Sequence, residues 1–406
     1  MLYSMYQAQT DALNMMRLLA APAATWLDMA WAGRDGAYAA RTFAAAMDVF
    51  ARAGTTHRRP AFAIAPVRVG NRDVAVRETV ALTLPFADLL HFEKDITEEQ
   101  PRVLVVAPLS GHFATLLRGT VQTLVADHDV YITDWRNARD VKLRDGAFDL
   151  DDFISHTIAC IEALGPGSHV LAVCQPTVAV LAAVALMAEA RNPAQPATMT
   201  LMAGPIDTRL NPTKVNELAK SQPIEWFERK LISKVPLGFP GAGRRVYPGF
   251  VQLTAFMSMN MDRHLQAHRT QVRNLVNGDT EKVAAHRIFY EEYFAVMDLA
   301  AEFYLTTIRN VFQEHLLPLG RLEYRGEKVD PKAIRRTALF TVEGEKDDIC
   351  AIGQTMAALD LCAGLSPYMK RHHLQTGVGH YGVFNGKRWA GEIYPQVREF
   401  IQAFSR

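Results

Sequence analysis

The sequence predicts an α/β protein built on an eight-stranded, mostly parallel sheet. Residues 61–84 hold two β-rich runs around a Gly-Asn-Arg-Asp turn, and six further short apolar runs alternate with helical patterns. Short runs rich in Val, Ile and Leu are typical of parallel strands that are buried on both faces. Two antiparallel strands followed by six mostly parallel ones is the strand count of the α/β-hydrolase fold.

The helical patterns divide the chain into three regions. The six apolar runs are residues 102–108, 129–135, 169–174, 198–204, 337–344 and 369–377. A long helical interval separates the fourth run from the fifth, which are strands six and seven of the fold. We therefore predict an N-terminal helical region (1–58), a hydrolase core (59–204 and 331–406) and a helical cap or lid inserted between strands six and seven (205–330).

The composition favours a globular protein of a reducing compartment. The chain has 406 residues, 49% of them apolar and 21% charged, with a net charge of +1. A balance so close to neutral gives no electrostatic reason to expect nucleic acid or an anionic membrane as partner. The four cysteines form no CxxC pair, which indicates free thiols and a cytoplasmic location. The uncharged run from Leu18 to Leu27 is too short for a transmembrane helix.

Residues 1–58 stand outside the predicted sheet. Small and apolar residues recur there at mixed helical spacing, as expected for amphipathic helices. The first interpretation is a packing layer or the contact surface of a homodimer. The second is attachment to a hydrophobic surface.

Three residues fall at the strand ends where this fold places its catalytic groups. Cys174 ends the run 169–174, Asp347 and Asp348 follow the run 337–344, and His380 follows the last strand. Their chain order, nucleophile then acid then histidine, is the order that the fold requires. Each residue also has a structural interpretation: a core cysteine, aspartates that cap a helix over 348–361, and a turn histidine. Their joint placement favours the catalytic interpretation, although it does not choose between the two aspartates.

This arrangement would supply what acyl transfer needs. An imidazole oriented by a carboxylate activates a thiol, and a helix that begins near Pro176 favours the thiolate through its dipole. The fold takes one oxyanion donor from the residue after the nucleophile, which is Gln175 here. The second donor should be a backbone N–H of the loop 109–112, from Ser110, Gly111 or His112.

Other chemistries have little support in the sequence. His264 and His268 lie four residues apart but lack the glutamate of the HExxH zinc motif, and we interpret them as part of an ordinary surface helix. No glycine-rich phosphate loop follows any predicted strand. We therefore expect neither a metal nor a bound cofactor.

Several separate motifs resemble the intracellular polyhydroxyalkanoate depolymerases, relatives of the polyhydroxyalkanoate synthases. They are VCQPTVAVLAA, VEGEKDDI, TGVGHYGVFNGKRW, APLSGHFATLLRGT and YITDWRNAR, together with the MLYSMYQAQ start. The resemblance runs over nearly the whole chain. It implies an enzyme that cleaves poly(3-hydroxybutyrate) in cytoplasmic storage granules, with the polymer or granule surface as its partner.

The resemblance also implies roles for individual residues. Cys174 becomes the nucleophile, His380 the base, and Asp347 rather than Asp348 the acid, because KDDI matches the family's acid, variable residue and isoleucine. Water, or coenzyme A as an acyl acceptor, would release the acyl group. Synthases typically have glycine two residues before and after the cysteine, whereas this chain has Ala172 and Pro176, which favours a depolymerase. A synthase-type acyltransferase and a non-catalytic granule protein are the alternatives.

Overall fold

The computed structural model describes residues 2–31, 37–259 and 261–405. Its centre is an eight-stranded sheet with the strand order β15-β14-β8-β7-β5-β6-β4-β3. Strand β4 is antiparallel to both of its neighbours, β3 and β6, and all the neighbouring pairs from β6 to β15 are parallel. This order and these directions are those of the α/β-hydrolase fold, which confirms the predicted fold class.

The strands of this sheet follow the apolar runs closely. Their bounds are β3 Val76–Thr83, β4 Ala87–Lys94, β5 Arg102–Val106, β6 Asp129–Trp135, β7 His169–Val173, β8 Thr198–Met202, β14 Ala338–Gly344 and β15 Lys370–Gln375. Strands β7, β8 and β14 are buried at every position. Such burial on both faces explains why they read as mainly apolar runs without a polar alternation.

The expected pairing of the first two strands was wrong in one respect. The Gly-Asn-Arg-Asp turn does join two antiparallel strands, β1 (Val67–Val69) and β2 (Arg72–Val74), but they form a separate two-stranded sheet. The main sheet instead begins with β3 and β4, which pair with each other downstream of that turn. The second strand of the fold therefore lies outside residues 61–84.

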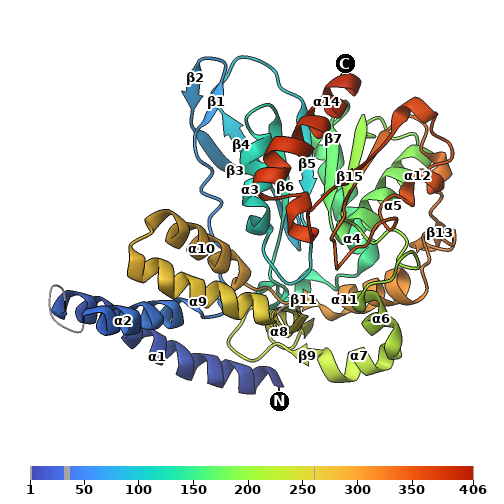
Figure 1. Ribbon diagram of the computed structural model, residues 1–406. Helices are drawn as coiled ribbons and strands as arrows, with labels where there is room; N and C mark the ends of the chain where they lie inside the picture. The colour runs from blue at the N-terminus through green and yellow to red at the C-terminus, as the bar shows by residue number, and fades with distance from the viewer. Residues whose placement is uncertain (1, 32–36, 260, 406) are drawn as a thin grey trace.

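Helices cover both faces of the sheet (Figure 1). On one face lie α4 (Leu150–Leu164) and α5 (Pro176–Glu189), and on the other lie α3 (Arg118–Leu124) and α14 (Tyr394–Phe404). Helix α5 is buried along most of its length, with only Leu186, Ala188 and Glu189 less than fully covered. An apolar helix of this kind belongs to the centre of a large core.

The segment between β8 and β14 lies beside the carboxyl ends of the strands. It contains α6 Lys214–Ser221, α7 Ile224–Leu231, α8 Gly249–Met259, α9 Met261–Asn277, α10 Thr280–Tyr293, α11 Ala301–Thr307 and a π-helical turn at Ile308–Gln313. Short strands accompany these helices, namely β9 Ser233–Lys234, β10 Arg245–Tyr247 and β11 Leu299–Ala300 in one small sheet, and β12 Glu323–Tyr324 with β13 Glu327–Lys328. The segment is thus mainly helical, with short strands as well.

The N-terminal region is a helical hairpin that packs on this segment. Helix α1 (Leu2–Ala30) lies along α2 (Ala37–Arg52), and α2 lies along α9 (Figure 1). The hydroxyl of Tyr3 donates to the buried carboxylate of Asp298 at 2.5 Å. Tyr6 stacks on Phe250 with ring centroids 3.6 Å apart. The start of α1 is therefore fastened to residues that follow α10 and that begin α8.

Candidate active site

Cys174 occupies the turn between β7 and α5. Its backbone φ is +66°, in the left-handed region that a residue with a side chain seldom adopts. Its N–H donates to the carbonyl of Met202 at 2.8 Å, and Pro176 fills the first position of α5, as predicted. Strain of this kind at a strand-to-helix turn holds a side chain out at the edge of the sheet.

The close packing of this turn depends on a glycine of the neighbouring strand. A Cβ atom placed on Gly204 would lie 1.9 Å from Oγ1 of Thr177, in the first turn of α5. The chain has Ala172 and Pro176 where the usual elbow motif has glycines. Gly204, just beyond β8, gives the room that lets α5 begin so close to the sheet.

The structure pairs His380 with Asp347. Nδ1 of His380 lies 2.8 Å from Oδ2 of Asp347, and both side chains are buried. The other oxygen, Oδ1, accepts from the backbone N–H groups of Ile349 and Cys350, each at 2.9 Å. Because the carboxylate only accepts, Nδ1 carries a proton, and Nε2 is the nitrogen that can take the proton of Cys174. Asp348 is exposed, and among the described residues His380 makes its hydrogen bond and ion pair with Asp347 and not with Asp348.

Charges at the site favour a thiolate beside an imidazolium. The pKa of Cys174 lies well below its ordinary value. The largest cause is a hydrogen bond from Cys350; burial acts in the opposite direction and raises the pKa, and the charge of His380 lowers it further. Burial acts to lower the pKa of His380, but Asp347 and Cys174 together raise it well above the usual range. The two groups therefore stabilise each other's charged form.

Cys350 is a member of the site that the sequence interpretation missed. It is buried, and its interaction with Cys174 is the largest influence that raises its own pKa, followed by burial. Its thiol therefore stays neutral beside the thiolate of Cys174. The sequence carried no signal for it beyond its position three residues after Asp347.

The segment after Asp347 is not the helix that was expected over 348–361. Only Ala358–Leu361 is helical there. The buried carboxylate of Glu343 accepts from the backbone N–H groups of Gly353, Thr355 and Met356 at 2.8 to 2.9 Å. Side chains that bind backbone N–H groups in this way compete with helix formation. Asp347 and Glu343 thus shape an irregular loop that presents Cys350.

The predicted oxyanion donors lie beside Cys174 and in the loop after β5. The Gln175 N–H lies against the sulfur of Cys174 and helps to lower its pKa. Gly111 has φ +96°, and a Cβ there would lie 2.8 Å from Cγ of Gln252, so only glycine fits. Its carbonyl accepts from Met297 N–H at 2.9 Å. This bond and the contact with Gln252 make α8 and the segment after α10 part of the loop's support.

The side chain of His112 is engaged elsewhere, so only its backbone could serve as an oxyanion donor. Its Nε2 lies 3.1 Å from the carbonyl of Tyr293, and burial lowers its pKa to about 4. The imidazole is therefore neutral near pH 7. Ser110 is half-buried in the same loop. Among the described hydrogen bonds, none uses the backbone N–H of Ser110, Gly111 or His112.

A cavity of about 920 Å³ opens on one side of His380. Aromatic side chains dominate its wall on α8 and α10, whereas Lys346 and Asp348 contribute charge from the loop after β14. The remaining lining comes from α9 and from the His380 loop. Its lining residues are Phe256, Arg263, His264, Ala267, His286, Phe289, Tyr290, Tyr293, Lys346, Asp348, Ile349, Gly377, Val378, Gly379, His380, Tyr381 and Gly382. The cavity is large enough for several ester units and is mostly apolar.

The histidines of α9 contribute to an aromatic cluster. His264 Nδ1 lies 2.9 Å from the hydroxyl of Tyr290, and the ring of His268 packs on the ring of the same tyrosine. Within the described parts of the chain, no three His, Cys, Asp or Glu side chains are grouped so that they could hold a metal ion. Among the same residues, no helix is both long enough and apolar enough to cross a membrane.

Comparison with known proteins identifies both the class and the family. The sheet order and the elbow at Cys174 define an α/β hydrolase. A family model described as PHB de-polymerase C-terminus matches residues 203–405, which is half of the chain. The chain therefore belongs to the PHB depolymerase family, and its class of activity is ester hydrolysis. A search of curated proteins found no match.

Three of the solved structures to which this chain is similar have low sequence identity with it. A soluble variant of monoglyceride lipase from Saccharomyces cerevisiae is 10% identical, with a TM-score of 0.48, and covers 84% of this chain and 99% of its own. An epoxide hydrolase from Bacillus megaterium is 14% identical, with a TM-score of 0.47, and covers 80% of this chain and 100% of its own. A 2-hydroxy-6-oxo-6-phenylhexa-2,4-dienoate hydrolase from Rhodococcus sp. is 12% identical, with a TM-score of 0.43, and covers 81% and 99%.

Proposed function

We propose that this protein is an intracellular poly(3-hydroxybutyrate) depolymerase that works through a cysteine acyl-enzyme. The observation that supports this most strongly is the contact chain from Asp347 through His380 to Cys174 at the strained turn after β7. Membership of the PHB depolymerase family supports the choice of polymer. The substrate on this account is the amorphous polyester of a cytoplasmic storage granule.

In the first half-reaction, His380 takes the proton of Cys174, and the thiolate attacks the carbonyl carbon of an ester. The resulting oxyanion accepts hydrogen bonds from Gln175 N–H and from a backbone N–H of the loop 110–112. The carbon–oxygen bond of the ester then breaks. The imidazolium returns its proton to the departing oxygen, so that one polymer fragment leaves with a hydroxyl end and the other stays as a thioester on Cys174.

In the second half-reaction, an acceptor releases the acyl group. His380 removes a proton from water, the oxygen attacks the thioester, and the cysteine leaves as the thiol with a free acid as product. The thiol of coenzyme A could replace water by thioester exchange, because thiolates attack thioesters readily. The product would then be an acyl-CoA. No resident cofactor takes part in either route.

The apolar cavity beside His380 supports a polyester as substrate. Its aromatic wall can cover the methyl groups and methylenes of a polymer segment, and an ester bound there would lie beside His380, which is one of the lining residues. Lys346 and Arg263 lie in the same wall. These cations would favour the carboxylate end of a chain or a released acid.

The experiment that tests the proposal uses the pure full-length protein and amorphous poly(3-hydroxybutyrate) particles, with and without coenzyme A. We expect soluble 3-hydroxybutyrate or its short oligomers in water, and acyl-CoA products in addition if the thiol is an acceptor. A matched incubation with 3-hydroxybutyryl-CoA should form no polymer. Abundant polymer would establish a synthase-type acyltransferase, and binding to particles without any product would establish a non-catalytic granule protein.

A further inference from the structure

Helix α1 is apolar on two opposite faces. The inner face recurs every three or four residues and is covered by α2 and, at its start, by Asp298 and Phe250. Its residues are buried or half-buried: Tyr3, Tyr6, Thr10, Leu13, Arg17, Ala20, Ala24 and Leu27. The guanidinium of Arg17 lies 5.7 Å from the ring centroid of Phe50 on α2. This face accounts for the packing of the hairpin and needs no other partner.

The outer face follows the same spacing and has no cover among the described residues. We name it the outer stripe: Met5, Ala8, Ala12, Met15, Leu19, Pro22, Trp26 and Met29, all of them apolar and all exposed. Met15, Leu19 and Trp26 are 69%, 71% and 64% exposed. Spacings of three and four keep such residues on one side of a helix. A surface of this length and character normally marks an interaction site.

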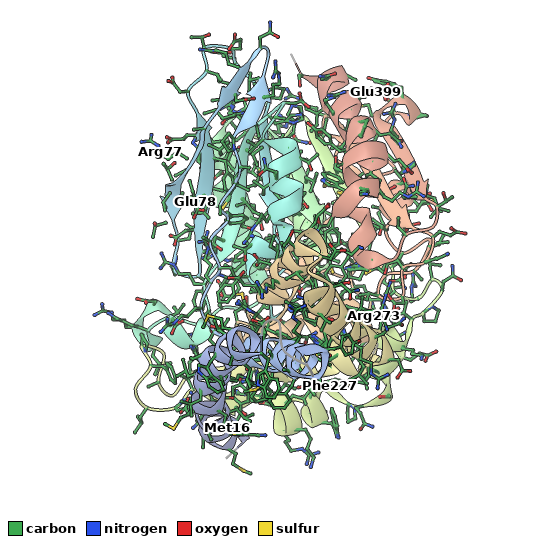
Figure 2. The ribbon with its side chains drawn as sticks, turned by 60° about the vertical axis from the view of Figure 1, so that its left-hand side comes forward. Met16, Arg77, Glu78, Phe227, Arg273 and Glu399 are labelled. Carbon is green, nitrogen blue, oxygen red and sulfur yellow. The ribbon has the colours of Figure 1, made fainter. Side chains whose placement is uncertain are left out.

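The outer stripe is broad. Met16 and Leu18 flank it and are 59% and 75% exposed. Figure 2 shows Met16 at the outer edge of the molecule, on the N-terminal helices below the sheet. A coiled-coil seam would be narrower and flanked by charged residues. The outer stripe is therefore better suited to a flat apolar surface than to a second helix.

The N-terminal helices lack the excess of positive charge that is expected of a segment that binds an anionic membrane. Residues 2–52 contain four arginines and four aspartates, with no lysine and no glutamate. Helices that bind anionic lipid surfaces carry an excess of Lys and Arg beside their apolar face. A polyester surface is apolar and uncharged, and it matches a neutral apolar stripe.

The hairpin packs on a helix that lines the cavity. Helix α2 packs along α9, and α9 contributes Arg263, His264 and Ala267 to the cavity wall. Two further exposed apolar residues belong to these helices, Leu265 on α9 and Phe289 on α10, and Phe289 lines the cavity itself. A polymer surface seated on the outer stripe would therefore lie across the hairpin from α9, the helix that contributes to the cavity wall.

We propose that the outer stripe of α1 seats the protein on the surface of the water-insoluble polyester. This inference rests on the proposed function, since it names the element by which the same enzyme holds its substrate. The stripe acts in surface binding alone, and cleavage of a soluble ester at Cys174 does not require it.

Two pairs of substitutions test the inference on the full-length protein. The pairs are Met15→Gln with Leu19→Glu, and Trp26→Gln with Met29→Gln, because Gln and Glu are good helix formers. The matched control is Leu237→Glu, at a leucine that is 93% exposed in the turn between β9 and β10 and is not part of the outer stripe. The measurements are co-sedimentation with amorphous poly(3-hydroxybutyrate) particles, release of acid from the particles, hydrolysis of p-nitrophenyl butyrate, circular dichroism and solution mass.

We expect each pair to weaken particle binding and particle hydrolysis by about tenfold or more, with soluble-ester hydrolysis unchanged and Leu237→Glu at wild-type level. Unchanged particle binding in both pairs would overturn the inference. A wild-type dimer that both pairs convert to monomer, with particle binding retained, would assign the stripe to a second copy instead. If the wild-type protein binds particles but releases no acid from them, the proposed function is wrong. If both substituted proteins release acid at the wild-type rate, only the docking inference is wrong.

Discussion

The turn after β7 and the middle of α4 each hold a cysteine, and the two thiols differ in backbone conformation, in their neighbours and in the direction of their pKa shift. Cys160 on α4 is completely buried, and burial raises its pKa to about 12. Cys174 stands at φ +66° beside His380 and Cys350, which hold its pKa well below the ordinary value. The residue type is the same at both places, so the backbone and the neighbours make the difference.

Replacement of Cys174 by alanine should have the largest effect. We expect turnover of p-nitrophenyl butyrate to fall by roughly 10⁴-fold or more, because the nucleophile of a covalent mechanism is lost. Steady-state kinetics measure the loss, and particle co-sedimentation should stay at wild-type level because the outer stripe is intact. A variant with more than about a tenth of wild-type turnover would show that the cysteine is not the nucleophile.

Replacement of Asp347 by asparagine should have the next largest effect. The amide no longer holds the imidazole as its Nδ1–H tautomer, and turnover should fall by roughly 10² to 10⁴-fold. Asp348→Asn is the matched control, since its exposed carboxylate lacks the hydrogen bond that Asp347 makes with His380, and it should lose far less. Equal losses in the two variants would contradict the assignment of Asp347.

The pH dependence of Cys174 alkylation tests the electrostatics of the site. A lowered pKa keeps the thiolate as pH falls, so iodoacetamide should label Cys174 at a nearly level rate from about pH 8 to about pH 6, where an ordinary cysteine slows about tenfold per unit. Cys350→Ala removes the hydrogen bond and should move the decline to higher pH, while Cys350→Ser keeps a donor and should move it less. Identical profiles in all three proteins would remove Cys350 from the site.

Replacement of Cys160 by alanine should have the smallest effect on activity. The side chain fills core space in α4, so we expect wild-type kcat/KM and a free energy of unfolding lower by about 1 to 2 kcal/mol. Chemical denaturation and kinetics measure the two quantities. A large loss of activity with unchanged stability would contradict the distinction between the two cysteines.

Much of the fold could be predicted because its buried strands have a strong local pattern. Strand β4 was missed because it mixes apolar residues with Asp88, His91, Glu93 and Lys94, and only its antiparallel pairing with β3 and β6 makes it a strand. Tertiary pairing of this kind has no sequence signal of its own.

The positions of Cys174, Asp347 and His380 could be predicted because the fold requires functional residues at particular strand ends. The place of Cys350 in the site could not be predicted, because it depends on two carboxylates that accept hydrogen bonds from backbone N–H groups. Asp347 holds the N–H groups of residues 349 and 350, and Glu343 holds those of residues 353, 355 and 356. The helical pattern of residues 348–361 gave no sign of this competition.

The most direct test of the account is intact-mass analysis after brief exposure of the protein to amorphous poly(3-hydroxybutyrate). We predict a covalent adduct with increments of about 86 Da, the mass of one ester repeat, because the mechanism passes through a thioester. Peptide mapping should place it on Cys174, and Cys174→Ala should carry none. Acid released without any adduct, or with the adduct on another residue, would contradict the assignment of Cys174 as the nucleophile.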